Sequence, residues 1–412
     1  MADNILVRAA NGVMDWVNER APGFMPFYRK HMTEYYAPKN FNIWYIFGVL
    51  SIVVLVNQIL TGIFLTMHYK PDAKEAFDSV EYIMRDVDWG WLIRYMHSTG
   101  ASAFFVVVYL HMFRGMLYGS YRKPRELIWV FGVLIFLVLM AEAFMGYLLP
   151  WGQMSFWGAQ VIVNLFSAIP LIGEPLSIWI RGDFVIGDAT LNRFFSFHVI
   201  AVPLALLGLV VAHILALHEV GSNNPDGIEI KEKLNEKGIP LDGIPFHPYY
   251  TVKDTFYVFA MFIIAAFIIF FAPTFGGWFL EHDNFTEANS LVTPAHIKPV
   301  WYYTPYYAML RVIPHKLSGV IVMFAAIAIF LTVVTPVYWF MSHEIIGTVA
   351  LAMSLLLFTM VAVYLFVLAR KMDERLEDRK DAEIIEGAGP LGFFPPKSIW
   401  PFWVALTVQL LA

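Results

Sequence analysis

The sequence predicts an all-α fold: a polytopic transmembrane bundle of about eight helices. Of its 412 residues 58% are hydrophobic and 15% are charged, and the mean hydropathy is +0.60. Soluble domains carry nearer ~25% charged residues. Several apolar segments also reach the ~20 residues that a helix needs to cross a bilayer. The net charge of −5 is small and gives no basis for nucleic-acid binding, so a membrane protein is expected.

The apolar segments set the expected helices in chain order. Seven are long enough to span a membrane, at about 43–67, 92–118, 127–149, 191–217, 255–273, 317–340 and 344–369, and a shorter one lies at about 398–411. Residues 150–190 are interrupted by Pro and Gly, so we expect short helices at the membrane surface there.

Lysine and arginine set the expected orientation, because short cytoplasmic loops carry the excess of positive charge. The basic residues gather before the first span, in the 114–126 loop and in the 218–254 loop. We therefore expect a cytoplasmic N-terminus, with loops 68–90, 150–190 and 274–315 on the opposite side. The charged segment 370–386 breaks this alternation, so the topology of the C-terminal part stays open.

Four histidines occupy two of the expected spans. His97 and His111 have 13 residues between them, and His198 and His213 have 14. At about 1.5 Å per residue, the members of each pair lie about 21–23 Å apart along one face of a helix. Both helices run in the same direction, so His97 matches His198 in depth and His111 matches His213. Two bis-histidine sites stacked across the membrane are expected.

Such sites suit haem iron that transfers electrons, since both axial positions are filled, whereas zinc needs more ligands at one depth. A single intramembrane histidine fits a hydrogen bond across a helix interface equally well; two matched pairs favour haem. The chain has no cysteine, which excludes disulfides, thiolate zinc sites, cysteine-bound iron–sulfur clusters and c-type haem attachment from this polypeptide.

Glycines repeat with the same step as the first histidine pair. Gly48 and Gly62, and Gly132 and Gly146, are each fourteen positions apart on neighbouring spans. A glycine leaves room for a flat macrocycle close to the backbone; the alternative is close helix packing through small residues. Arg94 and Arg114, near the ends of the first histidine helix, are candidate partners for haem propionates or snorkelling anchors.

Several motifs together resemble cytochrome b of the cytochrome bc1 complex, from about residue 37 to about residue 330. They are NQILTGIFLTMHY, GWLIRYMHSTGASAFFVVVYLHMFRGMLYGSY, AFMGYLLPWGQMSFWGA, FFSFHV, GSNNPDG, PYYTVKD and PAHIKPVWY. The resemblance implies the catalytic subunit of a ubiquinol:cytochrome c reductase of bacterial type, which works by a proton-motive Q cycle. It further implies two haem b groups, with His97/His198 as the low-potential pair and His111/His213 as the high-potential pair.

The resemblance also implies partners and a location. The partners are ubiquinone, membrane lipid, a Rieske iron–sulfur protein and cytochrome c1, in a homodimer of multi-subunit protomers. The location is the bacterial inner membrane. The implied parts are a cytoplasmic segment (1–42), a haem-binding four-helix bundle (43–218), a C-terminal transmembrane domain with the quinol-oxidation loop (219–340) and further helices of unknown role (341–412).

In this family the quinol-oxidation site lies at the end of the third helix, on the surface helices after it and in a Pro-Glu-Trp-Tyr loop. The matching residues here are Phe144, Tyr147, Met154, Gly158, Pro299, Trp301, Tyr302 and Tyr306. Val300 departs from the pattern, because a valine cannot take the quinol proton that the family's glutamate is proposed to accept. Glu142, within the third span, is the expected substitute; otherwise it is a cavity-facing acid paired with the backbone or an arginine.

On the inner side the resemblance assigns His218 and Asp254 to the quinone-reduction site, with Lys253 close by; Lys253 also fits a contact with lipid headgroups.

Two other classes of function remain as alternatives for the whole chain. In a transporter or channel, the four histidines would relay protons. In a di-haem subunit of a dehydrogenase or hydrogenase, the loop containing Pro299 and Trp301 would be unexplained.

Overall fold

The structure is a computed structural model that describes residues 5–323, 325 and 326. Within this part, five helical segments are long and apolar enough to cross a membrane. They are Ile43–Thr66, Gly90–Leu117, Glu126–Leu148, Asp188–Val220 and Phe246–Phe271. These five confirm the first five predicted spans. The predicted spans at 344–369 and 398–411, and most of 317–340, lie outside the described residues.

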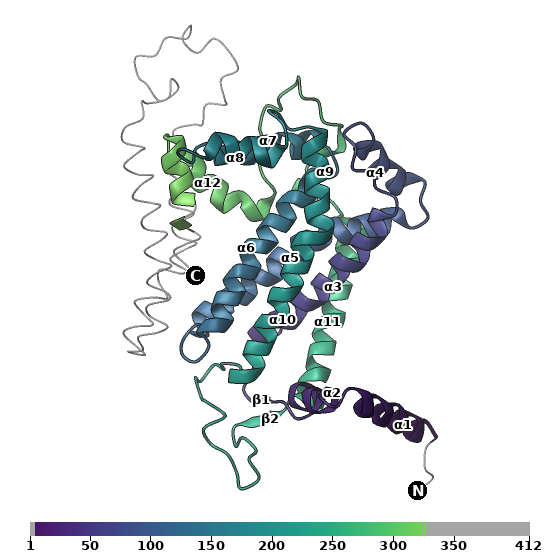
Figure 1. Cartoon of the computed structure of the whole chain (residues 1–412), viewed down its shortest axis with the longest axis vertical. Coiled ribbons are helices and arrows are strands. Elements are labelled where there is room, and N and C mark those ends of the chain that lie inside the picture. Colours follow the sequence, from purple (N-terminus) through teal and green to yellow (C-terminus); the bar gives the residue numbers. More distant parts are fainter. Residues whose placement is uncertain (1–4, 324, 327–412) are drawn as a thin grey trace.

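The helices of the bundle run side by side (Figure 1). α3 (Phe47–Thr66) packs on α5 (Gly90–Leu117), and α6 (Glu126–Leu148) packs on α10 (Val202–Val220). α11 (Phe246–Phe271) lies against α3 and α5. Many large apolar side chains of α11 are exposed, Phe256, Phe259 and Ile263 among them. Exposed apolar faces of this length are expected where a helix meets lipid.

Short helices cover one end of the bundle (Figure 1). They are α4 (Ala76–Arg85), α7 (Gln153–Phe166), α8 (Gly173–Arg181) and α9 (Asp188–Ser196). α7 and α8 are the short helices expected in residues 150–190. Turns η4 (Phe275–Gly277), η5 (His282–Phe285) and η6 (Trp301–Tyr303) and helix α12 (Thr304–Val312) follow α11.

The opposite end carries the N-terminal segment and a small sheet (Figure 1). Helices α1 (Ile5–Arg20) and α2 (Phe24–Tyr28) and the π-helical turn η1 (Arg29–Thr33) precede the first span, and the 3₁₀ turn η2 (Ile43–Tyr45) opens it. Strand β1 (Tyr36–Pro38) pairs antiparallel with β2 (Gly243–Pro245), with Ala37 opposite Ile244. This pairing ties the N-terminal segment to the loop before α11.

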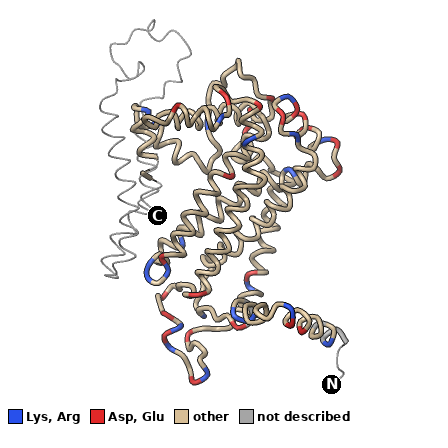
Figure 2. The backbone as a smooth tube through the Cα atoms, viewed as in Figure 1, with Lys and Arg blue, Asp and Glu red and all other residues tan. Residues whose placement is uncertain are grey.

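Charged residues gather at the two ends of the bundle and leave its middle apolar (Figure 2). This distribution is expected for spanning helices, because a charge in the hydrocarbon layer is costly. One buried cluster lies inside the bundle around Phe104, Phe105, Phe136 and Leu206, and it includes Tyr302 of the η6 turn. A second lies beneath α7 and α9. The η6 turn is therefore part of the bundle core.

Candidate functional site

The structure brings the four predicted histidines together in two pairs. The ring centres of His97 and His198 lie 6.1 Å apart, and those of His111 and His213 lie 6.2 Å apart. Each pair joins α5 to the Asp188–Val220 segment. The pairing in depth expected from the sequence is therefore the one that the fold contains.

A π-helical turn explains the unequal spacing of the two histidine pairs. His198 lies in η3 (Phe197–Ala201), a π-helical turn between α9 and α10, and Pro203 follows in the first turn of α10. A π turn holds about one residue more than an α turn. The extra residue between His198 and His213 is absorbed there, so both side chains still reach α5.

The Nδ1 atoms of three of these rings have polar neighbours. Nδ1 of His97 lies 2.9 Å from Thr61 Oγ1. Nδ1 of His198 lies 3.0 Å from the backbone oxygen of Glu142 and 3.0 Å from its carboxylate Oε1. Nδ1 of His111 lies 3.3 Å from Nη2 of Arg114. Thr61 and Glu142 can accept a hydrogen bond from Nδ1–H, which holds the imidazole in place and leaves Nε2 as the nitrogen that a metal ion takes. Arg114 can only donate, so its contact does not fix the His111 ring in this way.

Each of the four predicted glycines faces one of the histidines. A Cβ at Gly48 would lie 3.4 Å from His111 Cε1, and a Cβ at Gly62 would lie 3.3 Å from His97 Cε1. The corresponding distances are 3.5 Å from Gly132 to His213 and 2.4 Å from Gly146 to His198. The glycines thus make room beside the imidazole rings, which helix packing alone does not require.

The two arginines lie on α5 beside the histidines. Arg94 is three positions before His97, and Arg114 is three positions after His111. The Arg114 guanidinium lies 4.9 Å from the ring centre of Tyr45, and its Nη1 is 3.4 Å from Ser120 Oγ. Its Nε is buried without a hydrogen-bond partner in the described structure, so this cation has capacity for a further anionic group.

Tyr147, at the end of α6, contacts a carboxylate that sequence reasoning missed. Its hydroxyl donates a hydrogen bond of 2.9 Å to Oε2 of Glu281, whose side chain is buried with 4% exposure. Burial raises the pKa of the Glu281 carboxyl above its ordinary value. The available signal was an acidic residue directly after the apolar run GGWFL.

Backbone contacts fix the segment that carries Glu281, residues 281–289, to the start of α7. The amide of Gln153 donates to the backbone oxygen of Thr286 (2.8 Å), and the amide of Ala288 donates to that of Trp151 (3.0 Å). Oδ1 of Asn284 accepts from the amide of Ser155 (2.9 Å). Asn284 thus caps α7, whose preceding residue, Gly152, has no side chain to do so.

Residues 300–303, further along the chain, pack into the bundle. Val300 is 3% exposed, and Trp301 donates from Nε1 to Ser102 Oγ at 3.0 Å. The ring of Tyr302 stacks on Phe105 with centres 3.9 Å apart, and Tyr303 donates to the backbone oxygen of Met140 at 2.5 Å. Four successive residues therefore fill positions against α5 and α6.

The remaining residues predicted at this end lie on α6, α7, α12 and the loop before η6. A Cβ at Gly158 would lie 3.8 Å from Cε1 of Tyr147. The Phe144 ring packs against Phe194 at 5.3 Å, Met154 is 1% exposed, and Tyr306 is buried on α12. Pro299 precedes Val300 in the loop. We call this group of residues, with Glu281, the Tyr147 end.

At the opposite end, the three residues predicted for the quinone-reduction site occupy two separate locations. Lys253 and Asp254 line a hollow of about 150 Å³ with Tyr45 and Tyr250. His218 contacts the N-terminal segment instead: its Nδ1 lies 3.0 Å from His31 Nδ1, and Tyr35 stacks on its ring at 4.4 Å. His31 and Tyr35 were not identified in the sequence, because this contact joins residues almost 190 positions apart. We call this region the His218 end.

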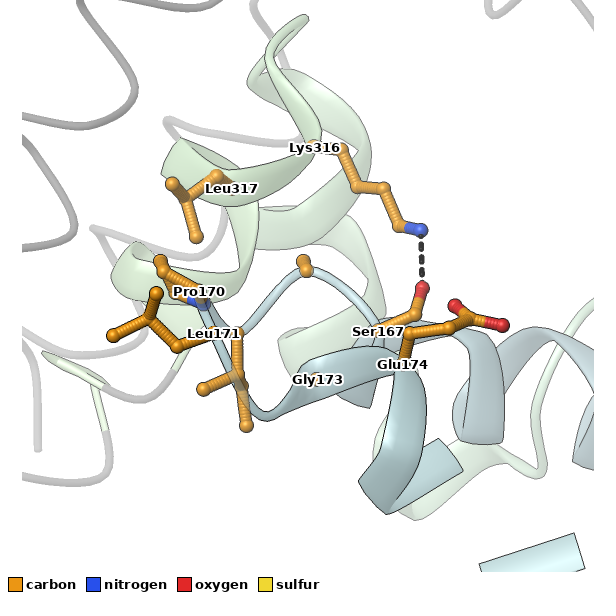
Figure 3. A pocket seen from close by; sticks show the side chains of 9 residues that line it. Ser167, Pro170, Leu171, Gly173, Glu174, Lys316 and Leu317 are labelled. Atoms are coloured by element: carbon orange, nitrogen blue, oxygen red, sulfur yellow. Dashed lines mark hydrogen bonds between the residues drawn. The ribbon is translucent and has the colours of Figure 1, made fainter. Parts of the chain in front are cut away.

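Figure 3 shows a second hollow, of about 390 Å³, between the turn after α7 and residues 316–317. Lys316 donates to Ser167 Oγ at 2.9 Å there, and burial lowers the pKa of its amine. The residues predicted from the sequence do not line this hollow. This hollow is therefore not the predicted functional site, although it is larger than the hollow beside Asp254.

Comparison with known proteins places this geometry in a family. Residues 32–221 match the family model "Cytochrome b/b6/petB", and residues 319–412 match the model "Cytochrome c oxidase subunit IV". Cytochrome b of Allochromatium vinosum is 64% identical over 325 residues, which cover 77% of this chain and 78% of that protein. Cytochrome b of Rickettsia prowazekii is 51% identical over 329 residues, covering 80% and 79%.

A similar fold is found in a solved structure. A chain of a hyperthermophilic respiratory complex III shares 37% identity with a TM-score of 0.71, over 86% of this chain and 96% of that one. Membership implies haem b and interaction with quinone. With its spanning helices and paired histidines, this chain belongs to the cytochrome b family and is the cytochrome b of a respiratory complex III.

Proposed function

We propose that this chain carries electrons between a quinol-oxidation site at the Tyr147 end and a quinone-reduction site at the His218 end, through two haem b groups, in a proton-motive Q cycle. The observation that carries the proposal is the pair of histidine couples, each faced by two glycines. The enzyme would be a ubiquinol:cytochrome c reductase, and its electron-accepting partners would be a Rieske iron–sulfur protein and cytochrome c1.

The donor set fits haem iron. Two imidazoles that each bind a metal at about 2 Å from opposite sides have ring centres about 6 Å apart. Both observed separations, 6.1 and 6.2 Å, agree with this value. In the described residues, histidine and acidic side chains form no cluster of three that would hold another kind of metal ion. We assign His97 and His198 to the low-potential haem and His111 and His213 to the high-potential haem.

The protein's own residues orient these ligands. Thr61 and Glu142 hold the Nδ1 sides of His97 and His198, and this leaves Nε2 to bind iron. Arg94 and Arg114 would pair with haem propionates. A haem with two imidazole ligands supplies reversible one-electron transfer without an open site for oxygen.

The quinol-oxidation site would use the residues of the Tyr147 end. Phe144, Met154 and Gly158 would shape it, and Tyr147 would hydrogen-bond the quinol. Trp301, Tyr302 and Tyr306 are held by the bundle core, so they would form a rigid wall. The sequence proposes Glu142 in place of the family's glutamate, but its carboxylate lies 3.0 Å from Nδ1 of His198, so Glu142→Gln tests whether it takes a quinol proton or only orients that imidazole. Slow quinol oxidation in Glu142→Gln with unchanged haem content would support that role, and normal turnover would exclude it.

The quinone-reduction site would use His218, Lys253 and Asp254. The hollow beside Asp254 and the imidazole of His218 lie at the same end of the bundle, where protons would be taken up. We further propose that this end faces the cytoplasm of a bacterium, that the chain crosses the inner membrane several times, and that the complex is a homodimer.

The first test is a reduced-minus-oxidised optical spectrum of the purified complex with a redox titration. Two b-type haems of separate potential are expected, and quinol should reduce them in a way that a quinol-site inhibitor blocks. Absence of any b-haem signal would contradict the proposal and favour a proton-relay transporter. Haems that quinol does not reduce would favour a dehydrogenase subunit.

A further inference from the structure

We propose that Glu281 accepts a quinol proton through the Tyr147 hydroxyl, in the role that Val300 cannot fill. This inference rests on the proposed function. A valine has no group that binds a proton, and here Val300 is 3% exposed within the apolar core of the bundle. A reaction that releases protons at this end therefore needs a base from another segment.

The position of Glu281 suits that base. Its Oε2 accepts the 2.9 Å hydrogen bond from Tyr147, the residue proposed to contact quinol. Three hydrogen bonds to the start of α7 hold the segment that carries it, and η5 (His282–Phe285) begins directly after it. A proton acceptor has to be within hydrogen-bond reach of the donor and held there, and Glu281 meets both conditions.

The electrostatic surroundings favour proton uptake. Burial raises the pKa of Glu281, which makes the carboxylate a stronger base than an exposed glutamate. A backbone hydrogen bond at Glu281, the Tyr147 hydrogen bond and the charge of Lys298 lower this pKa in part, whereas Asp283 raises it further. Tyr302 is the other titratable side chain that senses the charge of Glu281. Burial outweighs these opposing interactions, so the carboxylate takes up a proton more readily than an exposed glutamate does.

Other carboxylates near this end are less suitable. Oε1 of Glu142 is 3.0 Å from Nδ1 of the proposed haem ligand His198, so this carboxylate orients an imidazole. Asp283 and Glu287 lie on the same segment as Glu281, but both side chains are exposed to the surroundings. Glu281 alone among these four combines burial with a hydrogen bond to Tyr147.

The proposed step conserves protons and electrons. A quinol O–H donates its proton to Tyr147 Oη while the Tyr147 proton moves to Glu281 Oε2, so the tyrosine stays neutral and the carboxylate becomes a carboxylic acid. The other quinol proton would leave with the electron that the iron–sulfur partner takes, and the second electron would pass to the haem held by His97 and His198 in the proposed function. Glu281 then loses its proton to water at this end.

The test uses the purified complex with its partner subunits. Glu281→Gln keeps the shape and removes the base, and Glu287→Gln is the matched control on the same segment. We expect Glu281→Gln to lower quinol:cytochrome c reductase turnover at least about tenfold with unchanged haem spectra, since general-base groups contribute ~10²–10⁴-fold. Glu287→Gln should keep wild-type turnover.

The pH profile separates a base from a structural residue. Wild-type turnover should fall as acid protonates Glu281, and this acidic limb should be absent in Glu281→Gln. Tyr147→Phe removes the hydroxyl that links quinol to Glu281, so turnover should fall in the same way. The acidic limb should be absent from its residual activity too. This variant also serves if Glu281→Gln does not assemble.

Two results would overturn the inference: turnover of Glu281→Gln within twofold of wild type, or an acidic limb that stays in place in both variants. In either case a wild-type complex with two b haems that quinol reduces would leave the proposed function intact. A wild-type complex without quinol-reducible haem would instead reject the proposed function itself.

Discussion

The two ends of the bundle differ in how they are closed. At the Tyr147 end, Glu281, Val300 and Tyr302 are each less than 5% exposed, although most residues between Glu281 and Val300 are exposed. At the His218 end, the imidazole is covered by His31 and Tyr35 from an N-terminal segment, and Lys253 and Asp254 line an open hollow.

This difference suits different chemistry. A site that splits two electrons between two acceptors benefits from rigid, dry walls that hold the substrate in one geometry. A site that takes up protons benefits from access to water. The comparison predicts that changes at the buried end have larger effects than changes at the half-exposed end. The following experiments test it, beginning with the histidine pairs that connect the two ends.

The largest effect is expected from removing a proposed haem ligand. His97→Leu should eliminate one b haem and quinol-dependent reduction of cytochrome c, because an iron with one imidazole is held weakly and loses its redox poise. His111→Leu should eliminate the other haem. Haem content per complex and redox titration measure both. If either variant retains two normal b haems, the pairing is wrong.

The next largest effect is expected at Gly146. A Cβ there would lie 2.4 Å from His198 Cε1, closer than a contact allows, so Gly146→Ala should displace the imidazole and lower haem content several-fold. Gly208→Ala is the control. Gly208 lies on α10, which packs on the helix of Gly146, and a Cβ there has no neighbour within 4 Å. Equal haem content in the two variants would contradict the role assigned to the glycine.

A smaller effect is expected at Gly152, where a Cβ would lie 2.3 Å from Asn284 Oδ1. Gly152→Ala should push Asn284 away from α7, at a cost of about 1 kcal/mol from the lost cap, and should move Glu281 with it. Turnover should fall about tenfold with normal haem spectra, since catalytic geometry tolerates little displacement. Gly187→Ala, at a glycine with open space around it, is the control.

The smallest effect is expected at His31. His31→Leu removes the hydrogen bond to His218 at a half-exposed site, which is worth about 1 kcal/mol. Reoxidation of the His111/His213 haem by quinone should slow about threefold, and quinol oxidation at the other end should be unchanged. Rapid-mixing spectroscopy measures both steps. A larger loss than in Gly152→Ala would reverse the comparison between the ends.

The sequence by itself determined the spanning helices, the histidine pairs and the glycines that face them. These features follow from periodicity and composition: ~20 apolar residues predict a span, and a step of fourteen positions places two side chains on one helix face. Motif resemblance then located Tyr147, Trp301 and Tyr302. The family comparison confirms the fold, whereas the individual site roles stay predictions.

Only the tertiary structure determined which residues far apart in the sequence contact one another. The cap that Asn284 gives to α7, the contact of His31 with His218 and the hydrogen bond from Tyr147 to Glu281 have no signature in sequence spacing. The extra residue between His198 and His213 is visible in the sequence, but only the structure shows that a π turn absorbs it. Each contact depends on the position of a loop in the folded protein, and the packing and hydrogen bonds of the whole chain set that position. Glu281 in particular differs from the nearby Glu287 in its burial and in its hydrogen bond to Tyr147, and both properties arise only on folding.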